Sequence, residues 1–429
     1  MTAEVAIFNK SAVALAADSA VSIEGNNSHK IYNNAEKLFA LTKHHPVALM
    51  IYEHNELQGV PWELIIKSFR KELGKKHFDT LQGYKDAFLS FTREFYINLP
   101  SKHTERYLDI YFQDITLLTL SNVFELIEGH YDSGLREIDT IDSVVNMLLD
   151  QYQELPYFDG LDEKTFENTS VNFADFAMGV LSEDVDTSDF SDENNRDWLN
   201  TCNLFYTLCK LRALKQDPFY KNTTGLVFAG YGDKEYFPVI LECEVFGFFH
   251  ETLKVIRKPC LEGNPSAGLK AFAQRDEVDT FMQGICPPTK HNYEYNISEI
   301  CNHSTKALKD LIEEHVPENM REEATVKYVE SFDNHARGCF EDMQQHTKKQ
   351  HIDKVVNMIE HLPKNEMAYM AESLVNLTAF KRKVSSESDS VGGPIDVAVI
   401  SKGDGFVWIK RKHYFPESLN ADYGPTRTD

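Results

Sequence analysis

The chain has 429 residues, of which 44 are Lys or Arg and 67 are Asp or Glu, so its formal net charge is −23 at pH 7. Its 42% hydrophobic and 12% aromatic residues are enough for a packed core, which excludes a disordered or low-complexity protein. The acidity argues against a nucleic acid or an anionic membrane surface as a partner, because both are bound through clustered Lys and Arg.

Cysteine usage and hydropathy indicate the cellular compartment. The seven cysteines include no Cys-x-x-Cys pair, which argues against a disulfide scaffold and against a structural zinc site. The longest apolar runs, Ala12–Ala17 and Val47–Tyr52, are far shorter than the roughly 20 residues of a membrane-spanning helix. We therefore expect a cytoplasmic protein that needs no metal or cofactor.

The N-terminal part of the chain predicts strands followed by a helix. Short runs rich in Val, Ile and Ala are separated by polar turns, and residues Glu24–His29 read as a polar loop. A helix is expected between Pro61, which suits a first helical turn, and Gly74, which suits a helix end. The four expected strands are Glu4–Phe8, Ala12–Ala17, Lys37–Leu41 and Val47–Tyr52.

The rest of the chain alternates between helical and extended patterns. Residues 80–220 are helical, apart from an acidic loop at Glu183–Asp197, and residues 265–380 are mostly helical again. This order predicts an α+β fold in which helices cover antiparallel sheet. The later expected strands are a hairpin of Leu226–Ala229 and Tyr236–Glu242 around Gly230-Tyr231-Gly232-Asp233, and a final pair, Ile395–Ser401 and Phe406–Lys410.

The second residue of the chain offers a chemical possibility. Thr2 is small enough for an aminopeptidase to remove Met1, which would leave Thr2 with a free α-amine beside its own hydroxyl. An α-amine has a pKa of about 7.7–8.0, so much of it is neutral near pH 7 and can accept the hydroxyl proton. Threonine is common at this position, so the residues around it must decide its role.

Two charged residues downstream strengthen that interpretation. Asp18 ends an apolar strand, and Lys30 follows the polar loop. A lysine near the Thr2 hydroxyl would favour its deprotonated form, and an aspartate would hold the lysine in place. The alternative is an exposed Asp18–Lys30 salt bridge worth about 0–1 kcal/mol.

The first forty residues resemble the N-terminus of proteasome β-type subunits, which are N-terminal-nucleophile hydrolases. The interval from Thr2 to Asp18 matches that family without a gap, and Ala-Ala-Asp18-Ser19 is the family's own tetrad. The matching segments are Thr2-Ala-Glu-Val-Ala-Ile-Phe, Ala12-Val-Ala-Leu-Ala-Ala-Asp18-Ser19, Lys30-Ile31 and Glu36-Lys37-Leu38-Phe39.

The C-terminal part carries a second similarity. Asp389-Ser390-Val391-Gly392-Gly393 and the strands after it are similar to the family's closing Ser-Gly-Gly and last two strands. The likeness covers residues 2–75, about 225–255 and 368–412. It implies a four-layer α/β/β/α sandwich spanning residues 1–415, interrupted by helical insertions at about 80–220 and 265–365. The remaining residues, 416–429, are expected to form a flexible tail.

The family resemblance assigns roles to several residues and leaves some assignments open. Thr2 is the nucleophile, Asp18 and Lys30 tune it, and Ser19 supports them. Lys37 competes with Lys30 because the loop between Asp18 and Lys30 is shorter than usual. We prefer Lys30, since the spacing after it follows the family.

The chain also departs from the family. Ala20 replaces the usual Arg, and Glu53 replaces the glycine whose backbone N–H binds the oxyanion. Near the C-terminus, Ser390 matches a supporting serine, while its acidic partner is either Glu387, by spacing, or Asp389, by residue type.

The resemblance implies a threonine-type peptidase that cleaves an amide bond through an acyl-enzyme once Met1 is removed. It also implies peptide or protein substrates, assembly into a homo-oligomer, and an unfoldase or regulatory partner. Two alternatives remain open: a proteasome-like scaffold without catalysis, and an amidase that acts on a small molecule.

Overall fold

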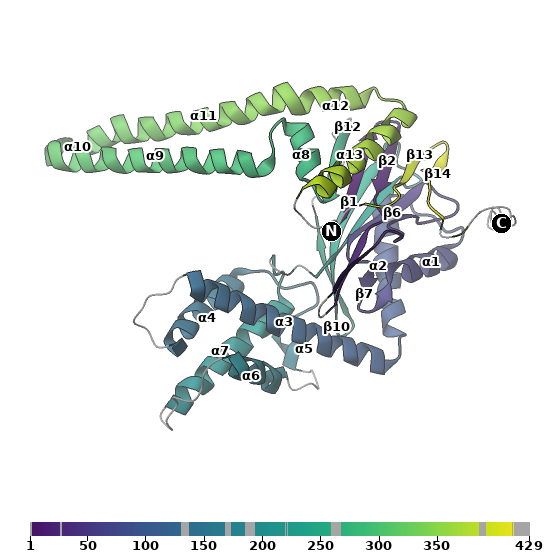
Figure 1. Ribbon diagram of the computed structural model, residues 1–429, viewed down its shortest axis with the longest axis horizontal. Helices are drawn as coiled ribbons and strands as arrows, with labels where there is room; N and C mark the ends of the chain where they lie inside the picture. Colours follow the sequence, from purple (N-terminus) through teal and green to yellow (C-terminus); the bar gives the residue numbers. More distant parts are fainter. Residues whose placement is uncertain are drawn as a thin grey trace.

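The computed structural model describes residues 2–25, 28–129, 137–167, 173–184, 194–218, 220, 222–258, 267–385, 392–413 and 415. Its centre is a pair of five-stranded sheets in which every neighbouring pair of strands is antiparallel (Figure 1). The first sheet has the order β12 (Ala267–Ala273), β1 (Ala3–Asn9), β2 (Ala12–Ala17), β13 (Asp396–Ser401), β14 (Gly405–Lys410). The second has the order β11 (Thr252–Arg257), β10 (Val239–Phe249), β9 (Thr224–Gly230), β6 (Val47–Glu53), β5 (Leu38–Ala40).

The N-terminal strand β1 lies inside the first sheet, and all seven of its residues are buried. Val5 is opposite Ala16 of β2 on one side and Ala271 of β12 on the other. Because side chains alternate along a strand, Ala3, Val5 and Ile7 face a cluster formed with α12 (Asp353–Glu360) and α13 (Lys364–Val384). Ala6 and Phe8 instead face the second sheet.

Apolar clusters separate the layers of this core. One joins the inner faces of the two sheets, with Leu15 and Ala17 on one side and Met50 and Val227 on the other. Another lies beneath α1 (Trp62–Leu73) and α2 (Leu81–Ile97), which cover the outer face of the second sheet. Trp62 is the largest fully buried side chain there, and its indole Nε1 donates to Thr224 Oγ1 at 3.0 Å.

A helical unit between α2 and β9 has its own core. Phe246 and Phe249 of β10 belong to that core, so this unit is anchored on the second sheet. Its helices are α3 (Ser101–Gly129), α4 (Glu137–Glu154), α5 (Glu163–Glu167), α6 (Phe173–Asp184) and α7 (Asn194–Leu214).

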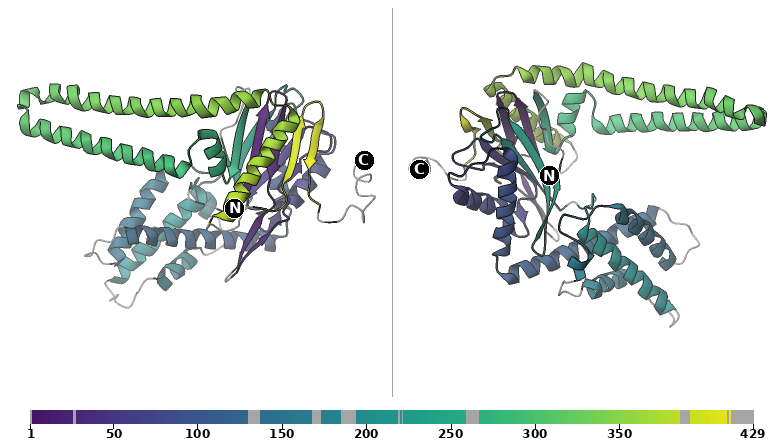
Figure 2. Two further views of the ribbon diagram at one scale, coloured as in Figure 1. Left: turned by 45° about the horizontal axis from the view of Figure 1, so that its top comes forward. Right: turned by 180° about the vertical axis from the view of Figure 1, so that it is seen from behind.

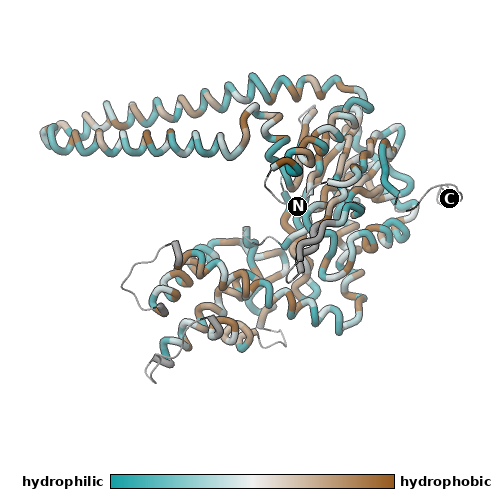
Figure 3. The backbone as a smooth tube through the Cα atoms, in the orientation of Figure 1, coloured by the Kyte–Doolittle hydropathy of each residue, from teal (hydrophilic) through white to brown (hydrophobic). Residues whose placement is uncertain are grey.

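A long helical arm extends away from the first sheet (Figure 2). It begins after the short helix α8 (Asp276–Gln283), and along α9 to α11 only Ile312 and Val329 are buried among the described residues. Most of its length is hydrophilic in Figure 3, which agrees with the exposure of its outgoing and returning helices to solvent. Its segments are α9 (Pro287–His315), α10 (Glu318–Ala324), the π-helical η1 (Thr325–Glu330), α11 (Ser331–Thr347), the π-helical η2 (Lys348–Ile352) and then α12.

The structure confirms a mixed α+β fold with antiparallel sheets. It differs at residues 21–32, where β3 (Val21–Gly25) pairs with β4 (Ser28–Tyr32) although Glu24–His29 was expected to be a loop. The alternation in Val-Ser-Ile-Glu before Gly25 could have predicted that hairpin. A second short hairpin, β7 (Glu56–Leu57) with β8 (Val60–Pro61), precedes α1.

Strand β12 lies in a region that was expected to be helical, and β11 was not anticipated. Residues 267–273 contain no β-branched side chain. Their extended form comes from the ladder with β1, more than 250 positions earlier in the chain, which local sequence cannot reveal. The expected tail, 416–429, and most of the expected acidic loop, residues 185–193, lie outside the described residues. In the described part of the chain, no helix combines the length and apolarity needed to cross a bilayer.

Candidate functional site

Thr2 lies at the start of β1, where the two sheets face each other, and only 2% of its surface is exposed. Its carbonyl accepts a hydrogen bond from Gln274 N–H at 3.1 Å, which extends the β1–β12 ladder by one residue. Its hydroxyl Oγ1 accepts from the backbone N–H of Glu53, the last residue of β6, at 3.4 Å. The buried Thr2 hydroxyl therefore links the beginning of β1 in the first sheet to the end of β6 in the second sheet.

Asp18 is completely buried directly after β2 and is bound by several donors. Its Oδ1 accepts from Ala3 N–H at 3.2 Å, and its Oδ2 accepts from the N–H groups of Ala20 and Gly392 at 3.3 and 3.0 Å. Its own N–H donates to the Ala3 carbonyl at 3.1 Å. These contacts hold the carboxylate beside the residue that follows Thr2.

The lysine that contacts Asp18 is Lys37, which precedes β5. Lys37 Nζ lies 2.6 Å from Asp18 Oδ1, and both side chains are almost entirely buried. The Lys37 carbonyl accepts from Ile51 N–H at 2.8 Å, so the backbone of β6 fixes its position. Lys30 was preferred from the sequence, but its backbone belongs to β4 and its side chain lies outside the described residues. Of the two alternatives, the described geometry favours Lys37.

Glu53 occupies the place where a glycine was expected. Its φ is 69°, a left-handed conformation that glycine adopts most easily, so Glu53 holds a backbone conformation that suits the glycine found there in the family it resembles. Its carboxylate Oε2 accepts from Thr223 Oγ1 at 2.8 Å. Burial raises the pKa of this carboxyl and Glu244 adds to the effect, whereas Thr223 and Lys258 lower it.

Ser19, another predicted site residue, directly follows Asp18. Ser19 is completely buried, its hydroxyl donates to the Pro394 carbonyl, and its N–H donates to the Gly392 carbonyl at 3.1 Å. It therefore ties the end of β2 to the segment before β13. Asp389, Ser390 and Glu387 lie outside the described residues.

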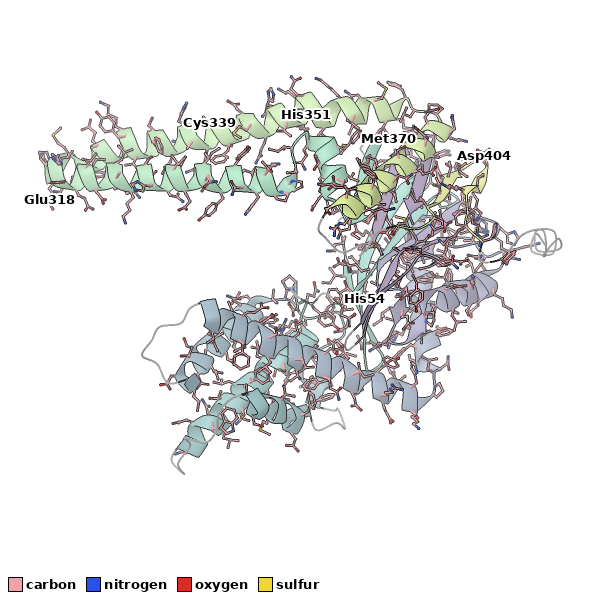
Figure 4. The ribbon with its side chains drawn as sticks, in the orientation of Figure 1. His54, Glu318, Cys339, His351, Met370 and Asp404 are labelled. Carbon is pink, nitrogen blue, oxygen red and sulfur yellow. The ribbon has the colours of Figure 1, made fainter. Side chains whose placement is uncertain are left out.

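A cavity of about 820 Å³ opens at Thr2. One wall consists of residues from the core, and the other comes from the helical unit between α2 and β9. His54 marks the core side in Figure 4, where the sheets approach that unit. The lining residues are Thr2, Val21, Glu53, His54, Asn55, Leu155, Pro156, Gln216, Asp217, Pro218, Tyr220, Thr223, Glu244, Phe246, Ile256 and Lys258.

The cavity combines apolar walls with a few charged groups. Glu244 pairs with Lys258 at 2.9 Å across β10 and the end of β11. Asp217 pairs with the buried Arg212 at 2.9 Å at the end of α7. Burial lowers the pKa of His54, so its neutral form is favoured. The cavity thus places polar and charged side chains near Thr2 between partly apolar walls.

A buried lysine fixes the helical unit to the core behind this wall. Lys254 of β11 is 1% exposed, and its Nζ lies 3.9 Å from the ring centroid of Tyr111 and 5.8 Å from that of Tyr220. Its Nζ also donates to Tyr111 Oη and faces the ring of Phe158. Burial lowers the pKa of Lys254 well below 10.5. Because Tyr220 also lines the cavity, this contact positions the outer wall.

The arrangement combines a hydroxyl, a buried Lys–Asp pair, a backbone N–H donor and an adjoining cavity. These are the parts that nucleophilic attack on a carbonyl requires. In the described ranges, no three His, Cys, Asp or Glu side chains are grouped to hold a metal ion. Comparison with known proteins gave no match, either to a family model or to a curated protein sequence.

Sequence reasoning missed Glu4, which lies beside this group. Glu4 is completely buried, and its Oε1 lies 3.7 Å from Lys37 Nζ. It occurs two residues after Thr2 in a strand, so the period-two alternation already places both side chains on one face. That spacing was a signal that could have identified it.

Proposed function

We propose that the chain is an N-terminal-nucleophile hydrolase of the kind it resembles, with Thr2 as nucleophile once Met1 is removed. The observation that carries the proposal is the position of Thr2 Oγ1. It accepts from Glu53 N–H, lies next to the backbone that Asp18 holds, and opens onto the 820 Å³ cavity. The Lys37–Asp18 pair takes the role that the sequence analysis assigned to Lys30 and Asp18.

The reaction would be acyl transfer from an amide to water. Thr2 Oγ attacks the carbonyl carbon while its proton passes to the α-amine of Thr2, and the Glu53 N–H stabilises the oxyanion. The proton then goes to the departing amine as the C–N bond breaks, which leaves an ester on Thr2. Water hydrolyses this ester and restores the hydroxyl.

The layer order supports the finer fold assignment in the proposal, the four-layer sandwich of this hydrolase class. Apolar clusters lie under α12 and α13, between the sheets, and under α1 and α2. Such an order has helix, sheet, sheet and helix in succession. The helical unit and the arm would then be insertions into that sandwich.

The cavity favours a second candidate within the same chemistry. Its volume lies within the roughly 300–1,000 Å³ of small-molecule sites, and the helical unit forms its outer wall. A small amide or a short peptide would fit such a space better than an unfolded protein. The peptidase with peptide or protein substrates, a homo-oligomeric assembly and an unfoldase partner remains the first candidate, by resemblance alone.

The test begins with the mass of the purified protein and the labelling of Thr2. Loss of Met1 exposes the amine, and a peptide β-lactone should then acylate Thr2 through opening of its ring. We expect one adduct, located on the first residue by peptide mapping. Thr2→Ala should give no adduct, and Thr2→Ser should retain some labelling.

A matched control is Thr92→Ala, which removes a buried threonine of α2 whose hydroxyl donates to the Phe88 carbonyl at 2.8 Å. This variant should be labelled like the wild type. Retention of Met1, or no adduct on a processed Thr2, would overturn the proposal in favour of a scaffold without catalysis. Labelling together with turnover of small amides but not peptides would support the amidase.

A further inference from the structure

Glu4 is a buried acid for which the reaction described above has no use. It lies on β1 opposite Ala17 on one side and Phe272 on the other, and none of its surface is exposed. Both carboxyl oxygens lack a hydrogen-bond partner among the described residues. Ala6 and Phe8 on the same side of β1 face the second sheet, so Glu4 points into the space between the sheets near Thr2.

Among the described side chains near Glu4 and Asp18, the ammonium of Lys37 cannot neutralise two carboxylates. Lys37 Nζ is 2.6 Å from Asp18 Oδ1 but 3.7 Å from Glu4 Oε1, and Asp18 also receives three backbone N–H groups. Of the two carboxylates, Asp18 therefore has the stronger stabilisation of its negative charge, from the closer ammonium and from the backbone N–H groups. A second buried anion would be costly, and a neutral carboxylic acid costs much less to bury, even without a hydrogen-bond partner.

The charged groups that act on Glu4 agree with this distribution. Burial raises its pKa to about 8, Lys37 lowers it, and Asp18 raises it again. The nearby Thr2 hydroxyl and the amino terminus of the chain also lower it, as the smallest contributions. Glu4 therefore retains a proton near neutral pH, while Asp18 and Lys37 form the ion pair.

We infer that Glu4 is a positioning residue of the proposed site, which must remain protonated for Thr2 to react and whose ionisation sets the alkaline limit of the reaction. This inference rests on the proposed function. With Glu4 neutral, Asp18 and Lys37 sum to zero charge beside the hydroxyl. With Glu4 ionised, the same space is negative, and the negative charge that develops on Thr2 Oγ is destabilised.

The experiment measures the rate of Thr2 acylation by the peptide β-lactone between about pH 6 and about pH 10. In the wild type we expect the rate to fall above about pH 8, by about tenfold per pH unit if one ionisation controls it. Glu4→Gln keeps the size and the neutral form, so it should react at neutral pH and lose that decline. The matched control is Glu56→Gln, an exposed glutamate of β7, which should retain the wild-type profile.

The outcomes separate the two proposals. A wild-type protein that is not acylated at any pH overturns the proposed function, and with it this role for Glu4. Acylation with the same alkaline decline in Glu4→Gln and wild type overturns the role of Glu4 alone. If Glu4→Gln does not fold, ¹³C-NMR titration of the wild-type Glu4 carboxyl decides: titration near pH 8 supports the inference, and titration in the ordinary range near pH 4 overturns it.

Discussion

Replacing Lys37 with methionine tests which lysine serves Thr2. Methionine fills a similar volume without an ammonium, so Asp18 and Glu4 lose the ammonium that contacts both of them. The companion variant, Lys30→Met, alters strand β4, which pairs with β3 outside the two large sheets. The sequence favoured Lys30 and the structure favours Lys37, so the two variants separate these assignments directly.

The expected magnitude follows from burial. Removing one partner of a buried ion pair costs about 3–5 kcal/mol, because the remaining charge has no counter-ion. Three backbone N–H groups still bind Asp18, so we expect the lower end, a loss of about 3 kcal/mol in the free energy of unfolding. Acylation of Thr2 should slow by about 100-fold or more, as is typical when a group that assists proton transfer is removed.

Urea unfolding and the rate of β-lactone labelling measure the two effects separately. Lys30→Met should be labelled at the wild-type rate. Normal labelling of Lys37→Met combined with a large loss in Lys30→Met would refute the assignment of Lys37. Circular dichroism at the labelling temperature should show that each variant is folded.

The remaining predictions concern stability as a function of pH, measured by urea unfolding. Folded Glu4 holds its proton up to about pH 8 instead of 4.5, so the wild type should lose stability relative to Glu4→Gln as pH rises between about 5 and 8. At about 1.36 kcal/mol per pH unit, the difference amounts to at most about 5 kcal/mol, and parallel curves would contradict the raised pKa. Folded Lys254 releases its proton well below 10.5, so the wild type should instead gain stability relative to Lys254→Met as pH rises towards 10.5. A gap between those two variants that does not change with pH would show that Lys254 is charged throughout.

The sequence anticipated the local elements of the core and several residues of the candidate site. Val47–Tyr52 and Ala12–Ala17 are strands because their apolar patterns are strong and bounded by turns. Thr2 and Asp18 could be named in advance from Met1 removal and from the end of an apolar strand, and Glu53 from the family resemblance. The choice between Lys30 and Lys37 could not be made from the sequence, because spacing along the chain does not measure distance across a sheet.

Composition, charge and the strand patterns near Thr2 were determined by the sequence alone, since they depend on neighbouring residues. Only the tertiary structure decided that Lys37 reaches Asp18, that Glu4 is buried beside them, and that a distant helical unit walls the cavity. Each of these facts joins segments that are far apart in the chain or on different strands. The pairing of β1 with β12 and the packing of one sheet on the other bring those segments together. Neither can be predicted from local sequence propensity, because both depend on residues that are distant in the chain.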